Sequence, residues 1–407
     1  MKLSIVICVY NTDEKLLNEC LASITNSTLD EDYEIVFVDD GSTKSYADLL
    51  LKYKVNYCKI DNRGHLGARL FGIKAASGKY VAFVDSDDTV SKNYHKPMLE
   101  LAEKTDADIV LNGWAFHTDR TKRVCVNDTT MASRIDVKGD DALLLYTAQR
   151  GREHSYFVNW NKIYRRELLL RTISELEAIG IANKRLTYSE DALMNFFNFK
   201  NAKHVVNTNT GFYFYRIHSS QTVTATDADK VKGQVAAMCA SFGIMEEHIG
   251  NNKHRETILS NLCEWKRLMF RTHKSYAKSL KSASLLEFVK ECYGLDNAPG
   301  SVSYDGAVYS NAELLGNNFE QIDAVIAEIY SLGRATTALY EKKSKVISRL
   351  LYACPNDVVF SQKAEYTVPR RDIAIRDRII HNPIVYKVGM IFFKKGSKLR
   401  NFLKKHL

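Results

Sequence analysis

The sequence has few of the features that mark membrane, secreted or disulfide-bonded proteins. No segment approaches the ~18 uninterrupted apolar residues that are needed to span a bilayer. The eight cysteines are scattered without a C-x-x-C pair, so we interpret them as reduced thiols rather than a disulfide frame or a zinc site. The apolar run at residues 3–9 leads into polar residues without a small-residue cleavage site, which favours a first strand over a signal peptide. We therefore expect a cytoplasmic protein, soluble or peripheral at the inner face of the cell membrane.

An excess of positive charge is also missing from most of the chain. The formal net charge is +9 over 407 residues, and residues 370–407 alone carry eleven Lys and Arg against two Asp. The preceding residues are therefore formally neutral. They offer no excess positive charge to meet phosphates, so we expect no nucleic-acid partner.

The order of the predicted elements indicates two kinds of structure in one chain. The N-terminal half contains four segments with the composition of buried strands: residues 3–9, 34–39, 57–60 and 80–84. Apolar residues recur at helical spacing between them, which predicts an α/β domain with a Rossmann-like, mostly parallel sheet. After residue 224 the pattern turns helical, with helices expected at residues 227–248, 258–280, 285–293, 319–332 and 336–351. We predict a catalytic domain at 1–224, a helical accessory domain at 225–369 and a basic amphipathic tail at 370–407.

Acidic residues follow two of the predicted strands directly. Asp85, Asp87 and Asp88 come after the strand at residues 80–84, and Asp40 ends the second strand ahead of a glycine turn. Open α/β sheets bind ligands just beyond the carboxyl ends of their strands, so these acids are expected at one edge. Asp85 and Asp87 can offer oxygens to one Mg²⁺ or Mn²⁺ ion that also holds a diphosphate. Taken alone, the run is better explained as an ordinary solvated turn or a helix N-cap, and the rest of the chain is what favours a metal site.

Four segments together resemble one protein family. They occur in the expected order at residues 4–11, 38–43, 62–72 and 83–88, the last with an Asp-x-Asp motif. Over about residues 1–224 the chain resembles bacterial family 2 glycosyltransferases of the GT-A fold. The resemblance implies a metal-dependent, inverting enzyme that moves a sugar from a UDP-sugar to a hydroxyl on a polysaccharide, a lipid-linked glycan or a protein. The chain departs from the family at Cys8, where proline is usual, and at Leu70, where asparagine is usual.

The resemblance also implies roles for individual residues. The nucleotide would be bound by Cys8, Tyr10, Asp40, Arg69, Asp85 and Ser86. The Mn²⁺ or Mg²⁺ ion would be held by Asp87 and His218. Contacts with the diphosphate or the acceptor would come from Trp160, Glu190 and Arg216. Trp160 is as readily explained as the anchor of a hydrophobic core, and a lone histidine such as His218 is more often structural.

Asp191 is the candidate general base. It stands with Glu190 ahead of an apolar helix, where the pair could simply cap the helix and complement its dipole. The family has the same acidic pair here, and an inverting transfer needs a group that takes the proton of the acceptor hydroxyl. We favour the base. The metal ion and cationic side chains would assist the departure of UDP.

The basic tail at residues 370–407 also contains an apolar cluster at 383–393. One hypothesis places it on the anionic inner leaflet, where each basic residue near the surface contributes ~1 kcal/mol. A packed terminal helix or a contact in a homo-oligomer explains the pattern equally well.

Two rival functions differ in class from a glycosyltransferase. A glycosyltransferase-like scaffold or partner subunit without activity has no use for Asp40, Asp85, Asp87 and Asp191 together. A nucleotidyltransferase would need a glycine- and lysine-rich phosphate loop after the first strand, and residues 9–13 lack one.

Overall fold

The computed structural model describes residues 1–29, 32–118, 123–126, 135–148, 154–186, 188–217 and 227–294. The chain divides into two units, Met1–Tyr309 and Ser310–Leu407, and every described residue belongs to the first. The helices predicted at 319–332 and 336–351, the tail at 370–407 and His218 lie outside the described residues. The domain boundaries after residues 224 and 369 stay predictions.

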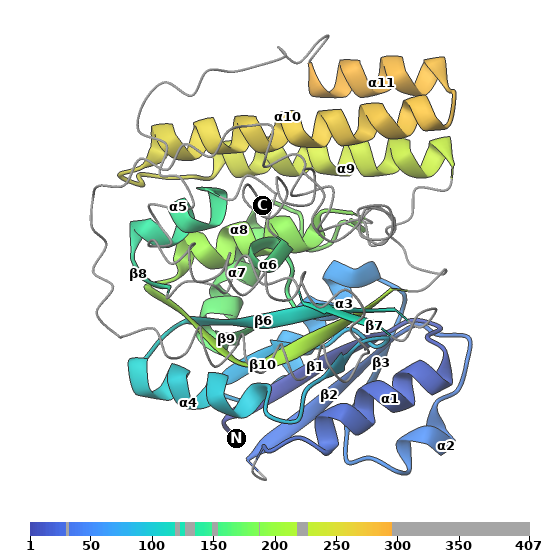
Figure 1. The fold of residues 1–407 in the computed structure, drawn as a ribbon, viewed down its shortest axis with the longest axis vertical. Helices are drawn as coiled ribbons and strands as arrows, with labels where there is room; N and C mark the ends of the chain where they lie inside the picture. The colour runs from blue at the N-terminus through green and yellow to red at the C-terminus, as the bar shows by residue number, and fades with distance from the viewer. Residues whose placement is uncertain are drawn as a thin grey trace, which may run out of the picture. The chain divides into compact units, whose positions relative to one another are not determined.

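Within the described residues, a ten-stranded sheet runs through the α/β part (Figure 1). Its strands are β1 (Leu3–Val9), β2 (Tyr33–Asp40), β3 (Asn56–Ile60), β4 (Tyr80–Phe83), β5 (Thr89–Val90), β6 (Ile109–Thr118), β7 (Arg123–Val126), β8 (Asp136–Lys138), β9 (Lys162–Arg165) and β10 (His204–Ile217). The spatial order is β3-β2-β1-β4-β9-β6-β10-β5, with β7 beside β6 and β8 beside β10. Strands β3, β2, β1 and β4 are parallel, as are β6 and β10, and the other pairs are antiparallel.

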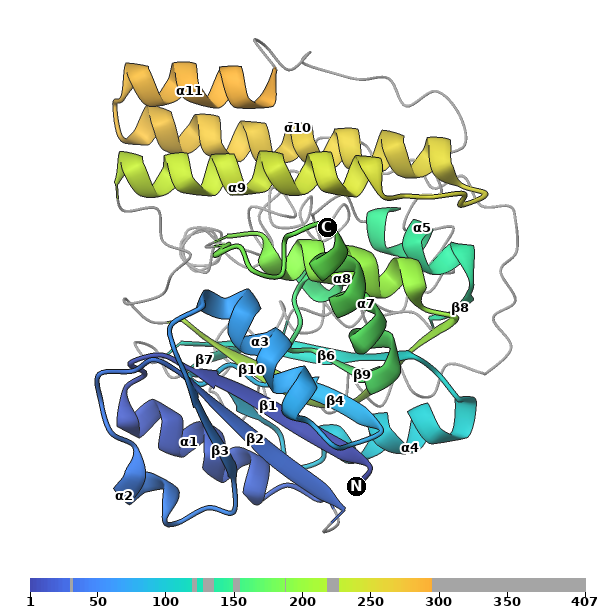
Figure 2. The ribbon, with the colours of Figure 1, turned by 180° about the vertical axis from the view of Figure 1, so that it is seen from behind.

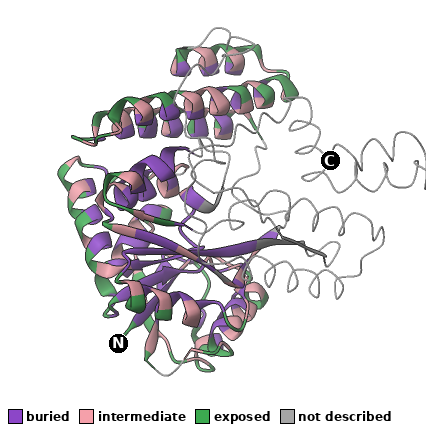
Figure 3. Cartoon of the chain, turned by 60° about the vertical axis from the view of Figure 1, so that its left-hand side comes forward, coloured by how far each residue is buried: buried purple, intermediate pink, exposed green. Residues whose placement is uncertain are grey.

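The central strands are continuous apolar runs because both faces of the sheet are covered. Ile5 and Ile7 of β1 belong to the same core cluster as Leu17 and Leu21 of α1 (Glu14–Thr25). On the opposite face, Val6 lies against α3 (Gly64–Ala75). Figure 3 shows the buried residues concentrated on the strands. This is the arrangement expected of helical crossovers between parallel strands, and it confirms the predicted α/β class.

Further helices follow the sheet in sequence. They are α2 (Ala47–Leu50), α4 (His95–Thr105), α5 (Asp140–Ala148), α6 (His154–Phe157), α7 (Arg166–Ala178), α8 (Glu190–Asn201), α9 (Ala228–Glu247), α10 (Arg255–Ser279) and α11 (Ala283–Tyr293). Helices α9, α10 and α11 lie side by side (Figures 1 and 2) and form the helical part that the sequence predicted. Helix α9 contacts α8, and α10 contacts α5. No helix in the described part of the chain combines the length and the apolar character needed to cross a membrane.

Candidate active site

The loops after β1, β2 and β4 are joined by hydrogen bonds at one edge of the sheet. Asn11 has a left-handed backbone (φ 52°). Its Oδ1 accepts the Thr43 N–H at 3.0 Å, and its own N–H donates to Ser42 Oγ at 2.9 Å. The hydroxyls of Thr12 and Ser86 are 2.7 Å apart. The carboxyl ends of three parallel strands therefore form one platform, which is where ligands bind in open α/β sheets.

The acidic run after β4 alternates between partly exposed and buried side chains. Asp85 and Asp87 are partly exposed, whereas Asp88 is buried. Asp88 accepts hydrogen bonds from Tyr213 Oη and from the Arg216 N–H, both at 2.7 Å, and so ties the loop to β10. Burial and the nearby charges of Asp87 and Asp85 raise the pKa of Asp88. Asp88 is therefore part of the scaffold, and Asp85 and Asp87 are the partly exposed carboxylates of the run.

Arg69 on α3 connects the acids after β4 to the acidic pair at the start of α8. Its side chain is only 5 % exposed. Nη2 donates to Asp85 Oδ1 at 3.3 Å, and Nη1 donates to Glu190 Oε1 at 3.3 Å and to Asp191 Oδ1. Because a guanidinium stays protonated, Arg69 is a fixed positive charge among three carboxylates. The structure thus brings together four residues that the sequence analysis singled out.

The environment of Asp191 raises its pKa to about 7. Burial is the largest cause, the charge of Arg69 opposes it, and the charges of Glu190 and Asp85 add to it. The ideal general base has a pKa near the operating pH, because it must be ionised and yet able to hold a proton. The electrostatics of Asp191 therefore suit proton abstraction.

Ser189 precedes this acidic pair with a left-handed backbone (φ 65°), which is uncommon for a residue other than glycine. Its hydroxyl lies 2.7 Å from the Ser241 hydroxyl and 3.3 Å from the Ala237 carbonyl oxygen, both on α9. The helical part of the protein thus contacts the loop that presents Asp191.

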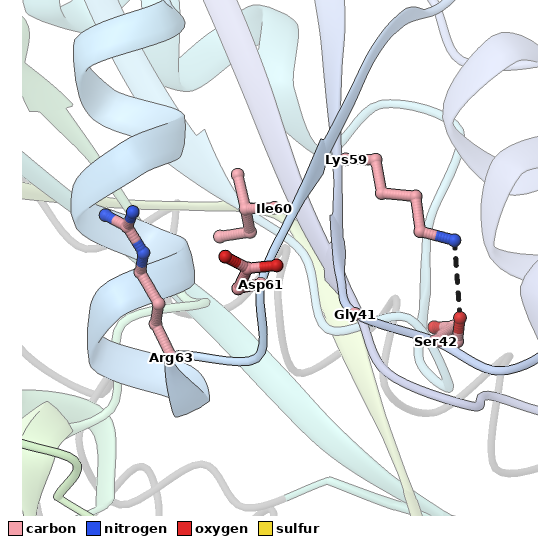
Figure 4. A pocket seen from close by; sticks show the side chains of 6 residues that line it. All are labelled: Gly41, Ser42, Lys59, Ile60, Asp61 and Arg63. Atoms are coloured by element: carbon pink, nitrogen blue, oxygen red, sulfur yellow. Dashed lines mark hydrogen bonds between the residues drawn. The ribbon is translucent and has the colours of Figure 1, made fainter.

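A cavity of about 510 Å³ lies at the ends of β2 and β3 (Figure 4). It is lined by Gly41, Ser42, Lys59, Ile60, Asp61 and Arg63. Lys59 Nζ donates to the Ser42 carbonyl oxygen at 3.4 Å, and Figure 4 shows its amine turned toward that loop. The volume is in the range of small-molecule and cofactor sites.

Asp40, predicted to bind the nucleotide, lies beside this cavity and holds the chain that lines it. Its two carboxylate oxygens accept the N–H groups of Arg63 at 2.7 Å and Gly64 at 2.9 Å. Burial raises the pKa of Asp40, and these two hydrogen bonds oppose the rise. The carboxylate therefore fixes the start of α3, the helix that carries Arg69.

Two further residues predicted to bind the nucleotide lie at the end of β1. Tyr10 is 52 % exposed. Cys8 is partly buried near Arg69 and Asp85, and burial raises the pKa of its thiol to about 12. At neutral pH this position contributes a neutral thiol to the platform.

Two candidates for diphosphate or acceptor contacts are buried. Trp160 is 3 % exposed and stacks on Tyr213 with ring centroids 4.4 Å apart, which is the packing of a core residue and leaves no open ring face for a sugar. Arg216 is 5 % exposed; its Nε donates to the Asp87 carbonyl oxygen at 2.9 Å, and its Nη2 donates to Glu19. In this structure Arg216 stabilises the loop that carries Asp87.

Asn159 was not among the residues expected at the site, and its Nδ2 donates to Asp191 Oδ1 at 2.7 Å. Asn195, which is fully buried on α8, was not expected there either. A signal was present, since Asn195 and Asn198 are three residues apart among the phenylalanines of an apolar helix. Amides on a buried face need partners.

The side chains after β4 fit a hard divalent cation, because such ions prefer carboxylate oxygens. Asp85 and Asp87 supply two carboxylates at the platform. Among the described residues, no group of three or more His, Cys, Asp or Glu side chains is arranged to hold a metal ion. An ion here would complete its shell with other oxygens, such as those of a diphosphate and water.

The chain is similar to proteins that are named as glycosyltransferases. Residues 4–171 match the family described as Glycosyl transferase family 2. EpsH of Bacillus subtilis (strain 168) is 28 % identical over 277 residues, which cover 65 % of this chain and 77 % of EpsH. EpsJ of the same organism, named as an uncharacterised glycosyltransferase, is 32 % identical over 218 residues, or 52 % of this chain and 60 % of EpsJ. The chain thus spans less than two thirds of EpsJ.

The fold is also similar to that of a solved structure. Residues 1–349 of S. aureus TarS, crystallised in complex with UDP-GlcNAc, align with a TM-score of 0.56 and 20 % identity over 72 % of this chain and 80 % of that chain. At this identity the likeness shows the fold, and it confirms the GT-A class expected from the sequence. Residues 4–171 thus match glycosyl transferase family 2, and the fold is a GT-A domain followed by a mainly helical part.

Proposed function

We propose that the protein is a glycosyltransferase that moves a sugar from a UDP-sugar to a hydroxyl group, with Asp191 as the general base. The observation that carries this proposal is the cluster around Arg69, which holds Asp85 beside Asp191 at the carboxyl edge of the sheet. Asp191 in that cluster has a pKa raised to about 7. An inactive scaffold has no need of a buried cation that joins these acids.

The transfer would proceed as a single displacement. The acceptor hydroxyl gives its proton to Asp191 as its oxygen bonds to the anomeric carbon of the donor sugar. The bond from that carbon to the diphosphate oxygen breaks, and its electron pair leaves with UDP. Attack opposite the leaving group inverts the anomeric configuration.

Support for a UDP-sugar comes from the cavity and from a structural neighbour. The cavity beside Asp40 and Ser42 is large enough for a nucleoside. TarS, which shares the fold, was crystallised with UDP-GlcNAc. Mn²⁺ or Mg²⁺ would be held by Asp87 and Asp85, and when bound it supplies a Lewis acid that neutralises the diphosphate.

A bacterial surface polysaccharide is the acceptor class that we propose. A poly(ribitol-phosphate) beta-glucosyltransferase of Bacillus spizizenii is 43 % identical over 119 residues, although these cover only 27 % of this chain and 19 % of that protein. This supports a polyhydroxyl acceptor, because a ribitol phosphate polymer presents hydroxyl groups.

Donor hydrolysis tests the proposal without knowledge of the acceptor. Wild type, Asp87→Ala and Asp191→Asn would be incubated with a panel of UDP- and GDP-sugars in Mn²⁺ or in EDTA, and released nucleotide would be measured. We expect UDP release from one UDP-sugar, and its loss in EDTA and in Asp87→Ala. Asp191→Asn should retain UDP binding and release UDP by transfer to water roughly 10²–10⁴-fold more slowly, because water must also lose a proton to the base.

The matched control is Asp48→Ala, which removes an exposed carboxylate from α2 and should behave as wild type. If wild type neither releases nor binds UDP in Mn²⁺, the protein is a scaffold and the proposal is wrong. UDP release that persists in EDTA would refute the metal requirement alone.

A further inference from the structure

We propose that Asn159 is a positioning residue for Asp191, and that Asn195 and Tyr164 set the orientation of its amide. The inference rests on the proposed function, because it explains how the base is held for proton transfer. Asn159, Asn195 and Tyr164 are buried, at 1 %, 0 % and 0 % exposure. They extend inward from Asp191, and Tyr164 Oη donates to Asn195 Oδ1 at 2.8 Å.

Backbone carbonyls determine which way the amide of Asn195 faces. Asn195 Nδ2 lies 2.9 Å from the Phe157 carbonyl oxygen and 3.2 Å from that of Val158. A carbonyl oxygen only accepts hydrogen bonds, so the NH₂ group of Asn195 must face these two atoms. The Oδ1 of Asn195 then faces the Tyr164 hydroxyl and accepts its hydrogen bond.

The orientation of Asn195 fixes that of Asn159 in turn. Asn195 Nδ2 lies 2.7 Å from Asn159 Oδ1, so Asn159 presents its oxygen to Asn195 and its NH₂ group to Asp191. Asp191 therefore faces a hydrogen-bond donor whose direction is set through Asn195 by the backbone. A donor held in this way favours the ionised carboxylate.

The donors to Asp191 also distinguish its two oxygens. Arg69 Nη1 and Asn159 Nδ2 both donate to Oδ1. Within the described residues, no hydrogen bond to Asp191 Oδ2 is present. The acceptor hydroxyl therefore delivers its proton to Oδ2: its O–H bond breaks, its oxygen bonds to the anomeric carbon, and the leaving diphosphate takes the electron pair.

The test compares Asn159→Ala, Asn195→Ala and the double variant by the pH dependence of kcat/KM for transfer. Loss of the Asn159 donor raises the pKa of Asp191. The acidic limb of the pH profile, where kcat/KM falls as Asp191 becomes protonated, should therefore move to higher pH by about one unit. Asn195→Ala should move the limb less in the same direction. In the double variant, Asn195→Ala should cause no shift of the limb beyond that of Asn159→Ala alone, because Asn195 acts through Asn159. UDP affinity should stay at the wild-type value.

A carboxyl NMR titration of isotope-labelled aspartate, with Asp191 assigned by loss of its signal in Asp191→Asn, gives a readout that needs no activity. A raised pKa in Asn159→Ala with an inactive wild type would uphold the amide chain and refute the proposed function. An active wild type with an unmoved pKa in Asn159→Ala would overturn the inference. The inference would also be overturned if Asn195→Ala shifted the pKa of Asp191 by the same amount in the Asn159→Ala background as it does alone.

Tyr164→Phe keeps the ring and removes only the hydroxyl, so it replaces Asn195→Ala if that variant fails to fold. The matched control is Asn112→Ala, another fully buried asparagine, whose Nδ2 donates to the Tyr94 carbonyl oxygen at 3.3 Å. It should lower stability and leave the pH profile in place.

Discussion

At the scale of single residues, the proton affinity of Asp191 is a balance among its neighbours. Burial and the charge of Glu190 raise its pKa, and the charge of Arg69 lowers it. Glu190 shares the guanidinium of Arg69 with Asp191. When two adjacent carboxylates share one cation, their mutual repulsion makes one of them easier to protonate. That carboxylate is then the one suited to accept a proton.

This balance predicts the effect of removing the charge of Glu190. Glu190→Gln should lower the pKa of Asp191, since the negative charge of Glu190 raises it. Activity requires ionised Asp191 and falls as the pH drops through its pKa, so the acidic limb of kcat/KM should move to lower pH. A pH profile of transfer between pH 5 and 9 measures this shift.

Glu177→Gln is the control, because Glu177 is half exposed and pairs with Lys74 away from Asp191. Its profile should match that of wild type. A limb that moves to higher pH in Glu190→Gln would mean that Glu190 supports the ionised base, contrary to the charge argument.

At the scale of elements, α3 places the cationic centre of the site. Its start is held by Asp40, and Arg69 lies in its middle. One turn after Arg69, Gly72 lets the helix approach the sheet closely. A Cβ added there would lie 2.4 Å from Val6 Cγ1 and 3.3 Å from Val38 Cγ2. The position of Arg69 therefore depends on a glycine that faces the sheet.

Gly72→Ala is predicted to lower both stability and activity. The added methyl group pushes α3 away from β1 and β2, which costs about 1–3 kcal/mol in a well-packed core. Arg69 moves with the helix, so transfer should fall more than UDP binding. Urea denaturation and donor hydrolysis measure the two effects.

Gly233→Ala tests the same change on α9, where a Cβ would meet nothing within 4 Å. It should raise stability by up to ~1 kcal/mol, because alanine favours the helix over glycine. If Gly72→Ala were as stable and active as wild type, close packing at this glycine would not position Arg69.

At the scale of the whole molecule, the helical part packs against the α/β part through aromatic side chains. Trp265 on α10 is 3 % exposed. Its ring contacts Tyr146 of α5 and Phe157 of α6 at centroid distances of 6.0 and 5.9 Å, and Phe242 of α9 at 5.5 Å. A shared aromatic core of this kind couples the unfolding of the elements that it joins.

Trp265→Ala is predicted to destabilise the α/β part and the helices α9 to α11 together. Loss of a buried tryptophan costs about 3–5 kcal/mol. Far-ultraviolet circular dichroism and UDP binding should be lost in one coincident transition at lower urea concentration, as in a two-state protein. Trp265→Phe keeps part of the contact and should fall between this variant and wild type.

Two separate transitions, with helical signal lost while UDP binding persists, would show that the helices unfold independently. That result would favour the boundary predicted after residue 224.

The sequence by itself determined the strands β1 to β4, the helices α9 to α11 and the acids that follow β2 and β4. These features are local: continuous apolar runs indicate strands covered on both faces, and helical periodicity indicates amphipathic helices. Strand polarity then requires Asp40 and Asp85 to lie at one edge. The residues of β1 and α9 were therefore accessible from pattern alone, as was the class of ligand expected at that edge.

Only the tertiary structure decided which polar groups meet. It made Asp88 a scaffold residue and left Asp85 partly exposed, and it buried Trp160 against Tyr213. It also placed Asn159 against Asp191, a contact with no local signature. Side chains from elements far apart in the sequence meet only when those elements pack, and burial then forces each polar group to find a partner. Pattern therefore predicts which residues are available, and packing decides which of them act together.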